Sequence, residues 1–351
     1  MTVQKEDKGV ARSVLDVLVF LLTAVYLILK AIYESCLPST HLPKKDIRGQ
    51  IALVTGGGGG LGRLVALRLA KLGATIVLWD INEKGVEETI ELVKGIGGKA
   101  YGFKCDIADT KSVYSVAKQT QKEVGDVTIL INNAGVVSGQ LLLDTPDHLI
   151  RRTFDVNIIA HFWTVKAFLP KMIEKGQGHI VTVASMAGYV GISKLVDYCA
   201  SKFAAVGFDE ALRVELEQQG IKDVKTTVVS PYFIQQTGMF ENVRSRFFPT
   251  LNSNQVADRI VEALVREEYV VMLPTIFKYL TVLKAMVPWS AMALFIANFI
   301  PDPSPHNQGN PVVQVKNADE KIKPVKNNSN SILSSSVTQL NKRLVLTGKD
   351  L

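Results

Sequence analysis

The feature that most constrains the fold is a run of glycines, Thr55-Gly56-Gly57-Gly58-Gly59-Gly60-Leu61-Gly62, between two apolar segments. Residues 51–54, before it, have the length and composition of a buried strand. Residues 61–72, from its end onward, repeat leucine and valine at helical spacing. A strand, a glycine turn and a helix in this order suit a dinucleotide, whose pyrophosphate binds at the positive end of the helix. The predicted cofactor-binding residues of this loop are Gly56, Gly60, Leu61 and Gly62.

Strand-like and helix-like segments alternate through residues 49–230. Residues 75–79, 127–131 and 179–184 are short, almost wholly apolar runs, as strands buried on both faces are. Segments of helical periodicity separate them, so the pattern predicts repeated βαβ units around a parallel sheet. We expect a single doubly wound α/β domain of the Rossmann type over residues 48–270.

An apolar segment, residues 14–33, follows a polar N-terminus, residues 1–13. A cleaved signal peptide, a membrane anchor and a core helix are the three interpretations of such a segment. It is just long enough to span a bilayer, it has almost no polar face, and no small-residue cleavage site follows it. The sequence therefore favours a membrane anchor helix. Three basic residues after the segment slightly favour a cytosolic main domain: Lys44, Lys45 and Arg48.

Residues 271–301 are apolar again, but two prolines and two lysines interrupt them. We expect an apolar helical segment that lies on the membrane or covers a pocket, and not a second span. Residues 302–351 are rich in Asn, Ser, Lys and Pro, a composition typical of a disordered tail.

The net charge of +7 is spread along the chain and is densest near the two ends. A nucleic-acid-binding surface needs its basic residues on one helix or stripe, so no nucleic-acid partner is predicted, and attraction to anionic lipid is favoured. The three cysteines, Cys36, Cys105 and Cys199, are far apart and form no Cys/His cluster. Neither a disulfide framework nor a metal site is expected.

Asp80 ends the second predicted strand, eighteen residues beyond Gly62. A carboxylate at this place accepts hydrogen bonds from the adenosine ribose hydroxyls and repels the additional phosphate of NADP. The residues that follow, Ile81, Asn82 and Glu83, include no arginine that would bind that phosphate. The predicted cofactor is therefore NAD(H).

Tyr198 and Lys202 are four residues apart, on one face of a predicted helix, and Ser185 lies thirteen residues before the tyrosine. Oxidation of an alcohol requires loss of the hydroxyl proton, and a free tyrosine with a pKa of about 10 is a weak base at neutral pH. A nearby ammonium lowers that pKa, and a serine hydroxyl holds the substrate oxygen beside the tyrosine. The three residues together predict acid/base catalysis on an alcohol.

In their order and spacing, these motifs resemble the short-chain dehydrogenase/reductase family over roughly residues 48–270. The residues that carry the resemblance are Thr55 through Gly62, Asn132-Asn133-Ala134-Gly135, Asn157, Ser185, Tyr198 and Lys202. The resemblance implies a catalytic tetrad of Asn157, Ser185, Tyr198 and Lys202, in which the asparagine completes a proton relay through water to the lysine. It also implies that Asp106 contacts the adenine amino group and that the cofactor is bordered by Asn133, Ala134, Gly135, Tyr198 and Lys202.

The anchor, the glycine loop and residues 237–240 are similar to a narrower branch, the epidermal retinol dehydrogenases and lipid-droplet 17β-hydroxysteroid dehydrogenases. That similarity implies a retinoid, steroid or other lipid alcohol as substrate, and a place on the endoplasmic reticulum or lipid droplets. Thr237 matches a threonine that contacts the nicotinamide carboxamide, but it is six residues after Pro231 and the family spacing is five. By resemblance alone, a homodimer through residues 149–175 and 201–219 is expected.

Apolar residues after Pro231 suit either a lipid pocket or the core of the domain itself. They are Tyr232, Phe233, Ile234, Met239, Phe240, Phe247 and Phe248. Two further interpretations stay open at this stage. One is a membrane-surface scaffold with a nucleotide-binding fold, and the other is a reductase that runs in the opposite direction.

Overall fold

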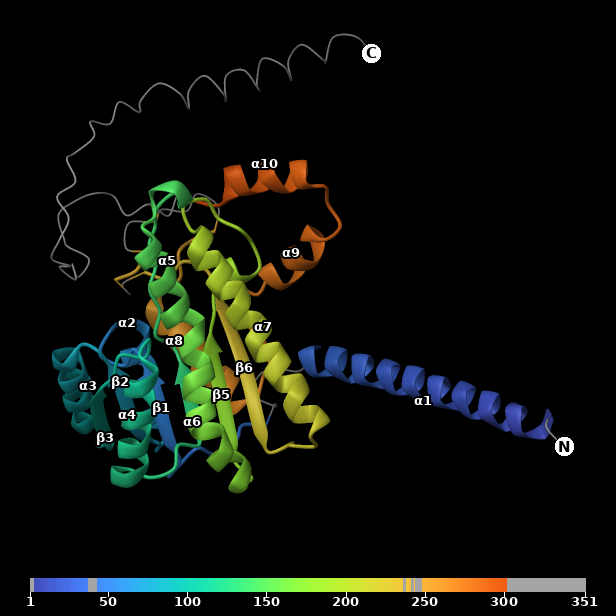
Figure 1. Cartoon of the computed structure of the whole chain (residues 1–351), viewed down its shortest axis with the longest axis horizontal. Coiled ribbons are helices and arrows are strands. Elements are labelled where there is room, and N and C mark those ends of the chain that lie inside the picture. Colours follow the sequence, from blue (N-terminus) through green and yellow to red (C-terminus); the bar gives the residue numbers. More distant parts are fainter. Residues whose placement is uncertain (1–2, 37–42, 236–237, 241–242, 244–247, 302–351) are drawn as a thin grey trace, which may run out of the picture. The chain divides into compact units, whose positions relative to one another are not determined.

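A seven-stranded parallel sheet forms the centre of the computed structural model, which describes residues 3–36, 43–235, 238–240, 243 and 248–301 (Figure 1). The strand order within these residues is β3-β2-β1-β4-β5-β6-β7. The strands are β1 (Ile51–Thr55), β2 (Thr75–Asp80), β3 (Ala100–Lys104), β4 (Ile129–Asn132), β5 (Gly178–Val183), β6 (Val224–Pro231) and β7 (Val270–Leu273). The order reverses between β1 and β4, and a ligand crevice forms at such a point. The predicted doubly wound fold is confirmed.

Helices cover both faces of the sheet, so the strands are buried on both sides. Val54 of β1 packs in one cluster with α2 (Gly60–Lys71), α3 (Glu83–Gly95) and α8 (Ser253–Val265). Leu53, the residue before it, packs on the opposite face with α4 (Thr110–Glu123) and α6 (Ala160–Glu174). Both side chains are fully buried. This two-sided burial explains why the central strands β1 and β4 are apolar runs without polar alternation.

Helical residues 149–175 contain a turn of a different helix type. After α5 (Asp147–Phe154) the chain forms one π-helical stretch, Asp155–Ile159, and then continues as α6. A π-bulge adds one residue to a turn and often occurs at a functional site. Here it carries Asn157, which is fully buried. The next long helix, α7 (Val196–Gln218), begins early enough that Tyr198 lies in its first turn.

The N-terminal helix α1 (Val3–Cys36) is 34 residues long and includes polar residues before the apolar segment. Residues Arg12–Lys30 have a mean hydropathy of 2.1, and none of this window is buried. By length and composition this part of α1 can cross a membrane.

The C-terminal apolar segment forms two short helices after β7, and not one. They are α9 (Phe277–Lys284) and α10 (Trp289–Phe299), with Pro288 as the residue that precedes the second. Ile300 and Phe277 pack against Tyr232 and Phe233, which follow β6, so this segment lies over the carboxyl end of the sheet (Figure 1). The predicted tail, residues 302–351, lies outside the described residues, as do Thr237 and Phe247.

Two histidines are buried in the core and are held neutral. Burial lowers the pKa of His161 on α6 to about 3, and the positive charge of Lys202 acts in the same direction. Burial also lowers the pKa of His179 on β5 well below its usual value, helped by Lys45. Unfolding exposes both rings, and an exposed ring binds a proton below pH of about 6.5. Acid therefore favours the unfolded chain.

We predict that the free energy of unfolding falls with pH between about 6.5 and 3, because in this window the unfolded chain binds more protons than the native one. His161 alone removes about 2 kcal/mol at pH 5. The His161→Gln variant, compared with wild type by denaturant unfolding in detergent from pH 7 to 5, flattens this slope. His148→Gln, at an exposed histidine, is the matched control. Equal slopes in wild type and His161→Gln would contradict the assignment.

Candidate active site

A cavity of about 620 Å³ lies at the carboxyl ends of the strands. The glycine loop and the ends of β2, β4, β5 and β6 form one part of its wall. Helices α7, α9 and α10 form the other part. Every predicted site residue that the structure describes lines this cavity, except Gly62, which lies in the first turn of α2, and Asn157, which is fully buried.

The glycine loop turns tightly, with two positions in the left-handed region of the backbone. Gly56 has a φ of +67° and Gly60 a φ of +49°, a region that favours glycine. At Gly62 in α2, a Cβ atom would lie 2.1 Å from the carbonyl oxygen of Gly56. Leu61 beside it is buried. Gly60 and Leu61, the first residues of α2, line the cavity, so the positive end of this helix lies where a pyrophosphate would bind.

The segment after β4 is fastened to the same loop. The Oγ1 atom of Thr55 accepts hydrogen bonds from the backbone N–H groups of Asn133 (3.0 Å) and Ala134 (3.1 Å). In return, Nδ2 of Asn133 donates to the carbonyl oxygen of Thr55 at 2.9 Å. Asn133 thus uses its side chain to join β1 to β4, and its neighbours Ala134 and Gly135 line the cavity.

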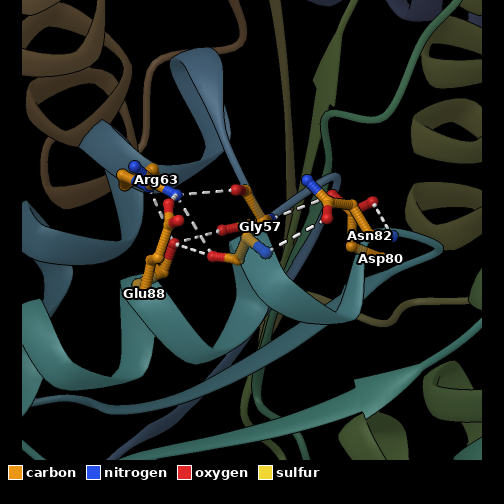
Figure 2. Close-up of polar contacts among 8 residues, drawn as sticks. Gly57, Arg63, Asp80, Asn82 and Glu88 are labelled. Carbon is orange, nitrogen blue, oxygen red and sulfur yellow. Dashed lines mark hydrogen bonds and ion pairs between the residues drawn. The ribbon is translucent and has the colours of Figure 1, made fainter.

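Asp80 lies at the end of β2, next to the loop. Its Oδ2 atom accepts a hydrogen bond from the N–H of Gly58 at 2.9 Å, and its Oδ1 atom accepts one from the N–H of Asn82 at 2.9 Å. Figure 2 shows Asp80 and Asn82 on one side of the loop and Arg63 and Glu88 on the other. The carboxylate is held in place and lines the cavity, where ribose hydroxyls would reach it.

Asp106 lines the same end of the cavity beyond β3. Its Oδ2 atom pairs with Nη1 of Arg152 at 3.0 Å, and its Oδ1 atom accepts from the N–H of Ala108 at 3.0 Å. Arg152 of α5, which the sequence did not single out, also lines the cavity. This pair is partly exposed, so it orders the wall and adds little to stability.

Ser185 and Tyr198 lie together in the wall at the end of β5. Burial raises the pKa of Tyr198, while a hydrogen bond with the Ser185 side chain acts in the opposite direction. The ring of Tyr198 packs edge-on against Phe240, with centroids 5.9 Å apart. A positive charge nearby would favour the ionised phenol, the form in which Tyr198 can act as a base.

Lys202 provides that charge. Its ammonium lies 5.7 Å from the centroid of the Tyr198 ring and donates to the carbonyl oxygen of Val183 at 2.9 Å. Burial lowers the pKa of Lys202 to about 8. At neutral pH the group is still mostly charged, and its field favours the ionised form of a nearby phenol.

Asn157 holds the backbone beside this pair. Its Oδ1 atom accepts from the N–H of Val136 at 2.8 Å, and its Nδ2 atom donates to the carbonyl oxygen of Val136 at 3.0 Å. A Cβ atom added to Gly135 would lie 3.4 Å from Oδ1 of Asn157 and 3.7 Å from Nζ of Lys202. The structure therefore brings Asn157, Ser185, Tyr198 and Lys202 to one place. The proton relay from Lys202 through water to Asn157 stays a prediction.

The remainder of the cavity is apolar. Phe233 and Phe240 contact each other edge-on, with centroids 5.0 Å apart, and both line the cavity. Helices α9 and α10 add further apolar lining residues: Leu280, Leu283, Met292, Phe295 and Phe299. Of the residues after Pro231, Tyr232 and Phe233 belong to the core of the domain and also line the cavity, and a lipid ligand there stays a prediction.

Two positioning residues were not found from the sequence. Asp197 precedes Tyr198 and is buried, and it accepts hydrogen bonds of 2.8 Å from Ser138 and from Thr153. Its place next to the tyrosine was the only sequence signal. Lys284 of α9 donates to the carbonyl oxygen of Tyr189 at 2.6 Å and fastens the apolar cover to the site. Its partner is a backbone atom 95 residues away, which no spacing indicates.

The described residues contain no group of three or more His, Cys, Asp or Glu that could hold a metal ion. Cys105 and Cys199 are buried and free, and burial is the largest influence raising the pKa of each thiol. Neither is a reactive thiolate at neutral pH.

The Gly62→Ala variant is expected to lose cofactor binding by more than about a hundredfold, or to fold poorly, because its Cβ atom would overlap the Gly56 carbonyl. Gly95→Ala, at the end of α3 and away from the cavity, is the matched control, since a Cβ atom there meets nothing within 4 Å. Titration of NADH fluorescence measures both, with circular dichroism to separate folding from binding. Similar affinities for the two variants would contradict the packing argument.

Comparison with known proteins agrees with this geometry. Residues 50–246 match the short chain dehydrogenase family model. Human epidermal retinol dehydrogenase 2 is 44% identical over 286 residues, covering 80% of this chain and 91% of that protein. Human estradiol 17-beta-dehydrogenase 11 is 42% identical over 283 residues, covering 81% and 93%.

Solved structures share the fold. A short-chain dehydrogenase/reductase from Burkholderia phymatum in complex with NAD has a TM-score of 0.62 and 24% identity, covering 71% of this chain and 96% of that one. A metagenomic short-chain oxidoreductase in complex with NADP has a TM-score of 0.55 and 25% identity, covering 65% and 96%. The chain therefore belongs to the short-chain dehydrogenase family, and it is an oxidoreductase that acts on CH–OH donors.

Proposed function

We propose that this protein oxidises the hydroxyl group of a hydrophobic alcohol to a carbonyl, with NAD as cofactor and Tyr198 as the base. The observation that carries the proposal is the position of Tyr198. Its phenol meets the hydroxyl of Ser185 in the wall of one cavity, between an apolar part and a part formed by the glycine loop. An apolar alcohol can therefore place its hydroxyl at the tyrosine while the nucleotide lies along the loop.

The residues of the chain supply binding and proton transfer. Ser185 donates to the substrate oxygen, and Tyr198, ionised in the field of the Lys202 ammonium, accepts the hydroxyl proton as the C–H bond breaks. NAD, when bound, supplies the acceptor for the hydride. Asn157 and the backbone of Val136 keep Gly135 close to Lys202, so the lysine stays beside the reacting groups.

Preference for NAD over NADP is the finer part of the proposal. Asp80 presents a carboxylate to the place where the adenosine ribose would bind. The additional phosphate of NADP would meet this negative charge at short range, which disfavours its binding. Ile81 and Asn82, the next residues in the wall, carry no positive charge to compensate.

A retinoid, a steroid or another lipid alcohol is the proposed substrate class. Two relatives are named for retinol and estradiol, both apolar alcohols. An apolar cavity of about 620 Å³, which includes the nucleotide part, is in the range of sites that enclose molecules of this size. Oxidation is the proposed direction, since NAD pools in the cytosol favour it. Reduction uses the same residues in reverse.

We predict that Tyr198→Phe lowers kcat/KM for alcohol oxidation by about 10²- to 10⁴-fold and leaves NADH affinity within about threefold of wild type. Full-length protein in detergent would be followed at 340 nm with retinol, estradiol and a long-chain alcohol, each with NAD and with NADP. Tyr269→Phe, at an exposed tyrosine before β7, is the matched control. Turnover that survives in Tyr198→Phe would refute the assignment of the base. Tight NADH binding without turnover in wild type would favour the scaffold alternative.

We also propose that the protein works on a membrane, of the endoplasmic reticulum or a lipid droplet, with its main domain in the cytosol. The apolar part of α1 is the first support. The second is the outer surface of α9 and α10, where Val282, Met286, Trp289 and Leu294 are all more than 60% exposed. No acidic residue occurs between Glu268 and Asp302, which suits contact with lipid. The same two helices cover the cavity, so a lipid alcohol would enter directly from the membrane.

The membrane contact predicts that Trp289 lies at the depth of the acyl chains. In vesicles with brominated acyl chains, the tryptophan fluorescence of the reconstituted full-length protein should be quenched. The quenching should be largely lost in Trp289→Phe, because Trp79 is fully buried and Trp163 is partly buried. Equal quenching of wild type and Trp289→Phe would show that this surface does not contact lipid.

Self-association remains a proposal that rests on the family resemblance. Helices α6 and α7 expose several apolar side chains that a second copy would cover: Phe162, Ile173, Phe203 and Val214.

A further inference from the structure

Behind the glycine loop, on the side away from the cavity, three side chains form a compact polar group that the mechanism does not use. Arg63 of α2, Glu88 and Thr89 of α3 make up this group, which we call the loop clamp (Figure 2). Nη2 of Arg63 pairs with Oε2 of Glu88 at 2.8 Å, and its Nε atom donates to Oγ1 of Thr89 at 2.9 Å. Arg63 does not line the cavity.

The clamp holds the loop backbone directly. Nη2 of Arg63 donates to the carbonyl oxygen of Gly58 at 2.9 Å. The hydroxyl of Thr89 donates to the carbonyl oxygen of Gly57 at 3.0 Å. The N–H of Gly58 donates at 2.9 Å to Asp80. One glycine is therefore held from both sides, by the arginine on one and by the ribose-binding carboxylate on the other. A movement of the guanidinium would be transmitted through Gly58 to Asp80.

The charges of the clamp decide the potential at this end of the cavity. Asp80 contributes one negative charge, and Arg63 is the positive group joined to it through Gly58. An unpaired arginine on the other side of Gly58 would offset the negative charge of the aspartate and attract a phosphate. Glu88 prevents this, because it pairs with Arg63. The charges of Asp80, Arg63 and Glu88 then add up to one negative charge. The Arg63 side chain is 26% exposed and that of Glu88 is 50% exposed, so solvent screens this ion pair only in part.

We propose that Glu88 is a specificity-determining residue for the cofactor. By neutralising Arg63 it keeps the ribose end of the cavity negative, and so excludes the additional phosphate of NADP. Arg63 is a positioning residue, which holds Gly58 so that its N–H fixes Asp80. The inference rests on the proposed NAD preference and extends it from Asp80 to a residue that does not touch the cofactor.

A simpler role for the clamp is to join α2 to α3. That role predicts that loss of the ion pair lowers stability and affects both cofactors equally. The specificity role predicts an unequal effect, since only NADP(H) carries the phosphate that senses the local charge. The ratio of the two dissociation constants therefore separates the two roles.

The test uses full-length protein in detergent, with NADH and NADPH binding followed by cofactor fluorescence. In Glu88→Gln, which keeps the shape and removes the charge, the ratio Kd(NADPH)/Kd(NADH) should fall about three- to tenfold, with Kd(NADH) within twofold of wild type. The fall should shrink as salt is raised. Glu91→Gln is the matched control, because it removes the same charge from the same helix, where Glu91 pairs with Lys94. Its ratio should stay as in wild type.

A second variant tests Arg63. Arg63→Lys keeps the charge but cannot reach the Gly58 carbonyl, Thr89 and Glu88 at once, so Kd(NADH) should rise about tenfold. An unchanged ratio in Glu88→Gln, or an equal change in Glu91→Gln, would overturn the proposal. A wild-type ratio near one would refute the NAD preference itself, whichever way the variants behave.

Discussion

The close contact between the Gly62 Cα and the Gly56 carbonyl is the constraint on which the other parts of the site depend. A Cβ atom there would lie 2.1 Å from that oxygen, so α2 can start this near to β1 only with glycine at the position. The contact directs the first turn of α2 to the crevice between β1 and β4. Thr55, at the end of β1, then meets the backbone of Asn133 and Ala134. One packing contact thus places the nucleotide part of the cavity and connects it to the strand that leads to the catalytic part.

The catalytic part is built at a cost in stability. Burial lowers the pKa of Lys202 from 10.5 to about 8, and this shift corresponds to about 3 kcal/mol against keeping the ammonium charged in the native protein at neutral pH. The carbonyl of Val183 offsets a part of this cost. A core residue chosen for stability would not be a lysine. In the proposed mechanism this buried charge has a function, because an ammonium in a site of low dielectric favours the ionised form of the Tyr198 phenol.

Strands and helices could be predicted where local pattern decides them. Buried strands such as β1 and β5 are apolar runs bounded by glycine or polar residues, and the helix that follows the glycine loop has a clear period. The π-helical turn at Asp155–Ile159 could not be predicted, because it depends on how Asn157 bonds to Val136 across the fold. The division of the C-terminal segment into α9 and α10 follows from Pro288. Its position over the cavity depends on contacts with Tyr232 and Phe233, far away in sequence.

The proposed catalytic residues stand out in the sequence more clearly than the residues that position them. Tyr198, Lys202 and Ser185 carry chemistry that requires these residue types at this spacing, so the sequence alone indicates them. Asp197 and Arg63 act by hydrogen bonds to backbone or hydroxyl groups that many residue types could supply. The same difference applies to the cofactor. The negative charge of Asp80 is visible in the sequence, but the potential that a phosphate would meet also depends on whether Arg63 is paired. That pairing is set by the approach of α3 to α2, a property of the folded chain and not of either helix alone.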